Sequence, residues 1–191
     1  MTTFIPAITI PYGVFASPAA SMLLPISLGG IIGYSTRPKK NQSQEPVSIK
    51  QPPLRPPPWV FGPAWTLLYG LMGYAAHRAI TAGLSPLTST PALIRSTKHS
   101  ATLYSIQLAL NLAWMPLFFG AKRPIEASVD ILALLGTNLY ITNLWWSIDR
   151  TASYLMVPYL GWLSFATYLC VGAGYLNGWD FRGKELRSKQ E

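Results

Sequence analysis

The residues best suited to ligand chemistry in this sequence are aromatic and amide side chains set in long apolar stretches. Trp65 and Tyr69 are four residues apart, so they share one face of a predicted helix. Gln107 and Asn111 have the same spacing, and Trp114 follows three residues later. Such faces would either pack inside a helix bundle or contact a ligand held there.

Three of these polar residues allow two interpretations. Gln107 and Asn111 should point into a helix bundle, where they either bond to a neighbouring helix or contact a ligand. Asp130 lies where a helix is predicted to begin, so it either caps that helix or presents a carboxylate to a ligand. Both interpretations place these side chains away from lipid.

The last apolar stretch carries a stripe of large and small residues. Tyr159, Trp162 and Ala166 have the spacing i, i+3, i+7, which predicts a wall with a recess. The sequence has one cysteine, two histidines, no glycine-rich phosphate loop and no Ser/His/Asp set. We therefore assign no catalytic and no metal-binding residues.

The elements that position these residues are predicted from the distribution of charge. Only 12% of the 191 residues are charged, and five long stretches carry none. A membrane-spanning helix needs about 20 apolar residues, and its backbone groups must be paired within the segment. We predict an all-α membrane protein, a five-transmembrane-helix bundle forming one domain over 1–191. The predicted helices cover about 8–35, 59–77, 100–121, 127–148 and 152–178.

The connections predict how the bundle is oriented. Residues 36–58 contain seven prolines, which favours a stiff lid or linker over an SH3-domain ligand. This loop, the loop after the third predicted helix and the basic tail 180–191 carry eleven Lys and Arg. The connections on the other side of the membrane carry four. The positive-inside rule then places the C-terminus in the cytosol. The net charge of +8 therefore reflects topology, and we expect no nucleic-acid partner.

Two further features concern the first helix and its packing. It lacks a basic start and is long for a signal peptide, so we expect it to be retained. Gly29 and Gly33, and likewise Ala109 and Ala113, are pairs of small residues four apart. Such pairs favour close helix packing and predict a homodimer contact within the lipid bilayer.

Four segments of the sequence resemble the translocator protein family, whose members are also called tryptophan-rich sensory proteins or peripheral-type benzodiazepine receptors. They are PPPWVFGPAWTLLYGLMGYA, QLALNLAWMPLFFGAKRP, the segment around Asp130, and LMVPYLGWLSFATYL. The resemblance covers about Ser27 to Trp179. It implies a five-helix bundle with a cavity that opens toward the cytosol under the first loop.

The resemblance also implies a ligand and the residues that line its cavity. Family members bind tetrapyrroles such as protoporphyrin IX, and animal members bind cholesterol and synthetic drugs; no cofactor is required. We therefore expect a receptor or carrier in porphyrin or lipid handling or in a stress response. The alternatives are light-dependent porphyrin breakdown centred on Trp65 and Trp162, and a membrane scaffold. Carried over by motif, the lining residues are Phe61, Gly62, Trp65, Tyr69, Asn111, Trp114, Asp130, Tyr159, Trp162, Ala166 and Leu169.

Three positions depart from the family pattern. Gln51 and Leu54 stand where the first loop usually has a lysine and an aromatic residue, so the lid is expected to close differently. Glu126 replaces a tryptophan that lines the drug pocket of animal members, so drug affinity is not assumed.

The tail after Trp179 and the retained first helix favour the mitochondrial outer membrane as the location of the protein, with the endoplasmic reticulum as the alternative.

Overall fold

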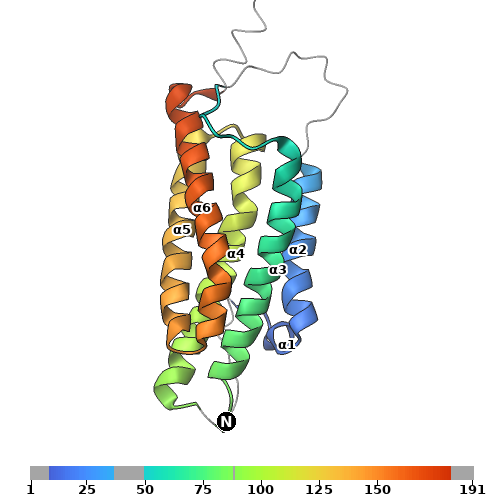
Figure 1. Ribbon diagram of the computed structural model, residues 1–191, viewed down its shortest axis with the longest axis vertical. Helices are drawn as coiled ribbons and strands as arrows, with labels where there is room; N and C mark the ends of the chain where they lie inside the picture. Colours follow the sequence, from blue (N-terminus) through green and yellow to red (C-terminus); the bar gives the residue numbers. More distant parts are fainter. Residues whose placement is uncertain (1–8, 37–49, 88, 182–191) are drawn as a thin grey trace, which may run out of the picture.

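The structure, a computed structural model, describes residues 9–36, 50–87 and 89–181, and all of its regular elements are helices (Figure 1). The predicted all-α class is therefore confirmed. Two short elements, the helix α1 and the π-helix η1, accompany five long helices. The bounds are α1 (Tyr12–Ala16), α2 (Pro18–Ser35), α3 (Pro58–Gly83), α4 (Pro91–Met115), η1 (Pro116–Gly120), α5 (Pro124–Trp146) and α6 (Arg150–Leu176).

Among the described residues, four helices are long and apolar enough to cross a membrane. They are Pro18–Ser35, Pro91–Gly120, Pro124–Trp146 and Arg150–Leu176. The helix α3 is 26 residues long and lies beside them, but it is not among these four. The fifth predicted span, which corresponds to α3, stays a prediction.

The first predicted helix, 8–35, is wrong in being continuous. Ser17 has an extended backbone, with φ −103° and ψ 121°, and it separates α1 from α2. The physical reason is Pro18, because a residue that precedes proline is disfavoured in the α region. The hydroxyl of Ser17 accepts a hydrogen bond from the backbone N–H of Ala20 at 3.4 Å and caps the new helix.

The predicted ends around the second loop are also wrong. The predicted ranges were 59–77 and 100–121, whereas α3 continues to Gly83 and the next helix already begins at Pro91. His77 and Arg78 marked the end of an uncharged stretch, but a helix can continue beyond the apolar part of its sequence. Thr90 caps α4 by accepting from the N–H of Leu93 at 3.3 Å. The last two helices begin at Pro124 and Arg150, three and two residues before the predicted starts at 127 and 152.

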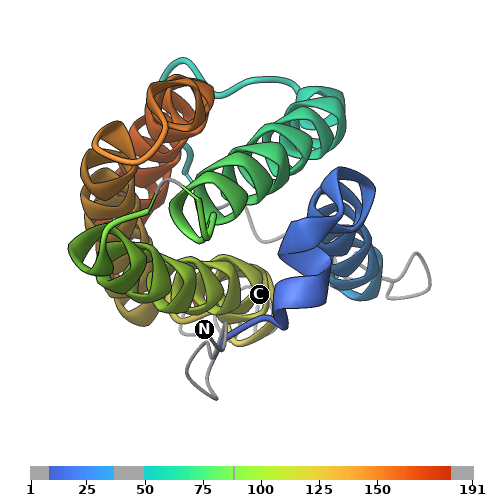
Figure 2. The ribbon, with the colours of Figure 1, turned by 90° about the horizontal axis from the view of Figure 1, so that it is seen from below.

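The long helices form a ring when the bundle is viewed along its length. α2, α3, α6, α5 and α4 follow one another around it (Figure 2), and α1 lies beside the lower end of α2 (Figure 1). The pair α2 and α3 approaches closely because Gly73 has no side chain: a Cβ there would collide with the backbone carbonyl of Ser21. The interior of the ring is filled by side chains from all five helices.

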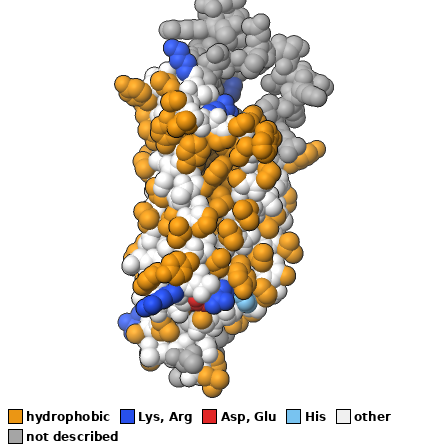
Figure 3. All heavy atoms as spheres, viewed as in Figure 1, with side chains coloured by type: hydrophobic (Ala, Val, Ile, Leu, Met, Phe, Trp, Pro, Cys, Tyr) orange, Lys and Arg blue, Asp and Glu red, His pale blue; other side chains and the backbone are white. Residues whose placement is uncertain are grey.

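Hydrophobic side chains cover most of the middle of the face shown in Figure 3, and charged side chains gather toward its ends. An ion pair joins α3 to the start of α6, where the guanidinium of Arg78 lies 2.9 Å from a carboxylate oxygen of Asp149. This distribution is typical of a bundle whose middle faces lipid. Most of the predicted loop 36–58 and of the basic tail 180–191 lies outside the described residues.

Candidate functional site

The centre of the candidate site is the indole of Trp65 on α3. Its ring centroid lies 5.4 Å from that of Tyr69, 6.4 Å from that of Tyr159 and 6.3 Å from that of Trp162. Aromatic pairs at these separations attract each other beyond the effect of burial. The four predicted residues are therefore brought together, and we call them the aromatic cluster. Trp59, by contrast, is 74% exposed, as is usual for a tryptophan at a membrane–water interface.

The start of α3 contributes one more predicted residue and leaves another outside. The half-buried ring of Phe61 lies 5.9 Å from that of Trp162, so it extends the aromatic cluster. Gly62 is exposed, and a Cβ added there would meet no atom within 4 Å. The structure therefore does not bring Gly62 into the cluster.

Beneath the aromatic cluster, a chain of hydrogen bonds connects three helices. The hydroxyl of Tyr69 donates to Oδ1 of Asn111 at 2.6 Å, and Nδ2 of Asn111 donates to the hydroxyl of Tyr159 at 2.8 Å. The hydroxyl of Tyr159 in turn donates to Oε1 of Gln107 at 3.3 Å. The inward orientation predicted for the amide face of α4 is confirmed, and its amides make bonds between helices.

Asn138 extends this chain to a fourth helix, α5. Its Nδ2 donates to Oε1 of Gln107 at 3.2 Å and to the backbone carbonyl of Leu134 at 2.8 Å. Asn138 was not among the predicted site residues, although an amide within an apolar span is itself a signal of an inward-facing residue. We call the five side chains of this network the polar chain: Tyr69, Gln107, Asn111, Asn138 and Tyr159.

Asp130, another predicted lining residue, lies on α5 and does not cap that helix. Because α5 begins at Pro124, the predicted start at 127 is wrong and Asp130 lies in the second turn. Its side chain is buried, and its Oδ2 has no hydrogen-bond partner among the described residues. The indole N–H groups of Trp114 and Trp162 are likewise buried and unpartnered in this part of the chain. These atoms favour the ligand-facing interpretation of Asp130.

A second apolar cluster contains Trp114 and Ala166 of the predicted lining residues. They pack with the buried residues Ala127, Ile131 and Cys170, which lie on α5 and α6. Leu169, the last predicted lining residue, precedes Cys170 and is half-buried on α6.

The π-helix η1 ends the helix that carries Trp114. Pro116 has no N–H, and the wider turn that follows is closed by a bond from the N–H of Ala121 to the carbonyl of Pro116 at 2.7 Å. This turn places the ring of Phe118 against that of Trp114, with centroids 5.0 Å apart. Single π turns within helices are frequent at functional sites.

The described end of the proline-rich loop is fastened to α6. The side chain of Asn177 accepts from the N–H of Lys50 at 3.0 Å and donates to the carbonyl of Lys50 at 2.8 Å. The hydroxyl of Tyr168 donates to the carbonyl of Pro53 at 3.1 Å. The chain therefore crosses from the end of α6 to the start of α3 (Figure 1). No pattern in the sequence identifies these anchors.

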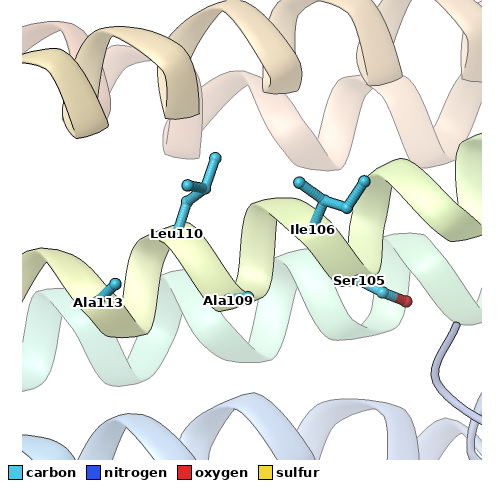
Figure 4. Close-up of a pocket in the computed structure, with 5 residues that line it drawn as sticks. All are labelled: Ser105, Ile106, Ala109, Leu110 and Ala113. Carbon is cyan, nitrogen blue, oxygen red and sulfur yellow. The ribbon is translucent and has the colours of Figure 1, made fainter. Parts of the chain in front are cut away.

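The two small-residue pairs have different environments. Gly29 packs against the ring of Tyr69, and Gly33 lies near the methyl group of Met115, so the first pair makes contacts within this chain. Ala109 and Ala113 instead line a cavity of about 390 Å³ on the outer side of α4 (Figure 4). The homodimer stays a prediction, and the α4 pair is the better placed of the two.

A second cavity, of about 350 Å³, lies between α3 and α6 beside the aromatic cluster. Trp162 contributes to both the cavity and the cluster. The residues that line the cavity are Ala64, Leu67, Leu68, Pro158, Gly161, Trp162 and Phe165.

No three His, Cys, Asp or Glu side chains come together to hold a metal ion within the described ranges.

Comparison with known proteins identifies the family. The model of the TspO/MBR family matches residues 21–176. The chain is 42% identical to the translocator protein homolog of Schizosaccharomyces pombe, over 83% of this chain and 90% of that protein. It is 37% identical to the translocator protein of Homo sapiens, over 64% of this chain and 69% of that protein. It is 35% identical to the tryptophan-rich protein TspO of Chlorobaculum tepidum, over 78% and 90% of the two chains. Together with the apolar helices, these matches show that the chain is an integral, multi-pass membrane protein of the TspO/MBR family.

Proposed function

We propose that the protein is a membrane receptor or carrier that binds tetrapyrroles such as protoporphyrin IX between its helices, with sterols as a second ligand class. The observation that carries this proposal is the aromatic cluster around Trp65. A flat, apolar ring that is poorly soluble in water gains most from a site lined by other rings and enclosed by helices. The family resemblance supports the same ligand class.

The unpartnered polar atoms support a ligand that carries polar groups of its own. Oδ2 of Asp130 can accept a hydrogen bond, and the indole N–H groups of Trp114 and Trp162 can donate one each. A protoporphyrin offers pyrrole N–H donors and carboxylate acceptors. Each bond made to a ligand would offset the cost of burying these atoms, which is about 1–3 kcal/mol for a neutral group.

We further infer that α3 is the fifth transmembrane helix and that the membrane is the mitochondrial outer membrane, with the C-terminus in the cytosol. The position of α3 between α2 and α6 supports the first inference, because both of these neighbours can cross a membrane. The excess of basic residues in the tail supports the orientation. Protease treatment of intact mitochondria that contain the C-terminally tagged protein should remove the tag; a protected tag would contradict the orientation.

A titration with protoporphyrin IX tests the proposed function. The purified full-length protein in nanodiscs should show saturable quenching of tryptophan fluorescence. Trp65→Phe should weaken binding about tenfold. The phenyl ring is smaller than the indole, so it makes less contact with the porphyrin and with the rings of Tyr69 and Tyr159. Trp59→Phe is the matched control, since Trp59 is exposed outside the cluster. Quenching that does not saturate would overturn the proposal.

The contact between Trp65 and Trp162 favours light-dependent porphyrin breakdown as the second candidate function. Their ring centroids are 6.3 Å apart, so both indoles would contact one bound porphyrin. Illuminating the complex and following the porphyrin absorbance separates the two functions. Breakdown would be established if the porphyrin absorbance falls with the wild-type protein and does not fall with Trp162→Phe, while that variant still binds porphyrin. Unchanged absorbance would leave the receptor or carrier.

A further inference from the structure

Two amide side chains face each other where α4 packs against α5. Gln107 and Asn138 are both fully buried, and Nδ2 of Asn138 donates to Oε1 of Gln107 at 3.2 Å. That oxygen also accepts from the hydroxyl of Tyr159 at 3.3 Å, so two donors share one acceptor. The remaining atom of each amide has a different environment.

Each amide leaves one polar atom unpartnered among the described residues. On Gln107 this atom is Nε2, a donor, and on Asn138 it is Oδ1, an acceptor. An unpaired buried group of this kind costs about 1–3 kcal/mol, and lipid around the bundle offers no replacement partner. The unpaired donor and the unpaired acceptor therefore lie on two amides that already contact each other.

Turning the amides over does not remove this mismatch. The N and O positions of an amide are assigned from their bonding partners. Inverting Gln107 alone would place its NH₂ group against the NH₂ group of Asn138. Inverting Asn138 would place its oxygen against the carbonyl of Leu134, which now receives a bond of 2.8 Å. Neither inversion improves the pairing of the two side chains.

We propose that Gln107 and Asn138 bind one small hydroxyl-bearing molecule, in the first instance water. A hydroxyl group accepts one hydrogen bond and donates another, as Nε2 of Gln107 and Oδ1 of Asn138 require. The terminal torsions of Asn and Gln are broad, so small rotations that keep the bonds of Oε1 and Nδ2 can direct both atoms at the molecule. Because solvent reaches neither atom, the bound molecule is enclosed by protein.

The bound molecule would complete the polar chain below the aromatic cluster. Asn138 and Gln107 lead through Tyr159 and Asn111 to Tyr69, and the rings of both tyrosines lie against Trp65. Gln107 and Asn138 thereby act as positioning residues for the site. This last step rests on the proposed function, whereas the binding of the hydroxyl group does not.

Water-edited solid-state NMR of the full-length protein in bilayers tests the binding itself. The side-chain amides are labelled with ¹⁵N, and their signals are assigned through Gln107→Leu and Asn138→Leu. Polarisation should pass from water to both amides without any added ligand. Transfer from the hydroxyl of added cholesterol, with none from water, would assign the site to a ligand hydroxyl. No transfer in either sample would overturn the proposal.

A pair of neighbouring variants tests the positioning role. Asn138→Leu keeps the branching and the number of side-chain heavy atoms and removes the acceptor, so water transfer to Gln107 should be lost and protoporphyrin IX affinity should fall about threefold to tenfold. Thr137→Val is the control, since the hydroxyl of Thr137 bonds to Ala133 of its own helix at 2.8 Å. Unchanged transfer to Gln107 in Asn138→Leu would show that the pair is not the site. Failure of the wild-type protein to bind porphyrin would remove the proposed function and leave the water transfer intact.

Discussion

The amide of Asn111 donates to the hydroxyl of Tyr159 across a distance of 2.8 Å, and this bond joins α4 to α6. Oδ1 of the same amide accepts from Tyr69, so one side chain fastens three helices. Both tyrosines turn their rings toward Trp65. Asn111 therefore supports the aromatic cluster without belonging to it.

Replacing Asn111 by leucine should destabilise the bundle. The change leaves two buried phenol hydroxyls with one partner fewer each, and we expect the free energy of unfolding to fall by about 1–3 kcal/mol. Unfolding by denaturant in a detergent micelle would measure this. Asn143→Leu, at an exposed position of α5, is the matched control and should have little effect. Equal effects of the two variants would mean that the hydrogen bonds of Asn111 contribute nothing net.

Gly29→Ala should disturb the site from the outside. The added Cβ would collide with the ring of Tyr69, so either the ring moves or α2 separates from α3. We expect a loss of about 1–3 kcal/mol in unfolding free energy, together with weaker protoporphyrin IX binding. Gly30→Ala adds the same methyl group where no atom lies within 4 Å, and it should leave both measurements unchanged. A silent Gly29→Ala would show that the close packing of α2 on Tyr69 is not required.

Asp149→Ala should cost more stability than Arg78→Ala. Oδ1 of Asp149 accepts from the N–H groups of Thr151 and Ala152 and caps α6, while Oδ2 pairs with Arg78. Loss of such a cap costs about 1 kcal/mol, and a partly exposed ion pair contributes about 0–1 kcal/mol. Thermal unfolding of Asp149→Asn, which keeps an acceptor for the cap, should fall between the two. Because both substitutions remove the ion pair, the reverse order would show that the cap contributes no net stability and that Arg78 makes further stabilising contacts.

Asn177→Ala should release the described end of the proline-rich loop. Both bonds to Lys50 are lost, so the amide of Lys50 should exchange its hydrogen about tenfold faster or more. Amide-resolved hydrogen exchange measures this directly. Tyr168→Phe removes only the bond to Pro53 and should leave the protection of Lys50 unchanged. Unaltered exchange in Asn177→Ala would mean that other contacts hold the segment.

Spacing along the sequence predicted the parts of the site that lie on one helix. The pair Trp65 and Tyr69, and the inward face of α4 with Gln107 and Asn111, follow from the helical repeat alone. Asn138 was missed because three of its four neighbours at helical spacing on α5 are apolar, namely Leu134, Leu135 and Ile141. Its role depends on α4, which only the folded bundle places beside it.

Other errors arose because charge marks the edge of the apolar region rather than the end of a helix. The uncharged stretch after Asp130 suggested that a helix begins there, whereas the helix begins at Pro124 and already contains Glu126 in its first turn. Gly62 was expected at the cavity from its position in the family motif, yet it lies on the exposed side of α3. The anchor at Asn177 could not be predicted, because it binds backbone atoms 127 positions away along the chain.

The two hydrogen bonds between Lys50 and Asn177 affect the order in which the parts of the protein reach their final structure. The connection that leads into α3 receives its anchor only after α6 has been synthesised, so its final shape must be among the last to form. The same dependence limits protein engineering. A fusion inserted directly after Leu176 would displace Asn177 and free the connection, whereas one placed after Phe181 would leave both bonds in position.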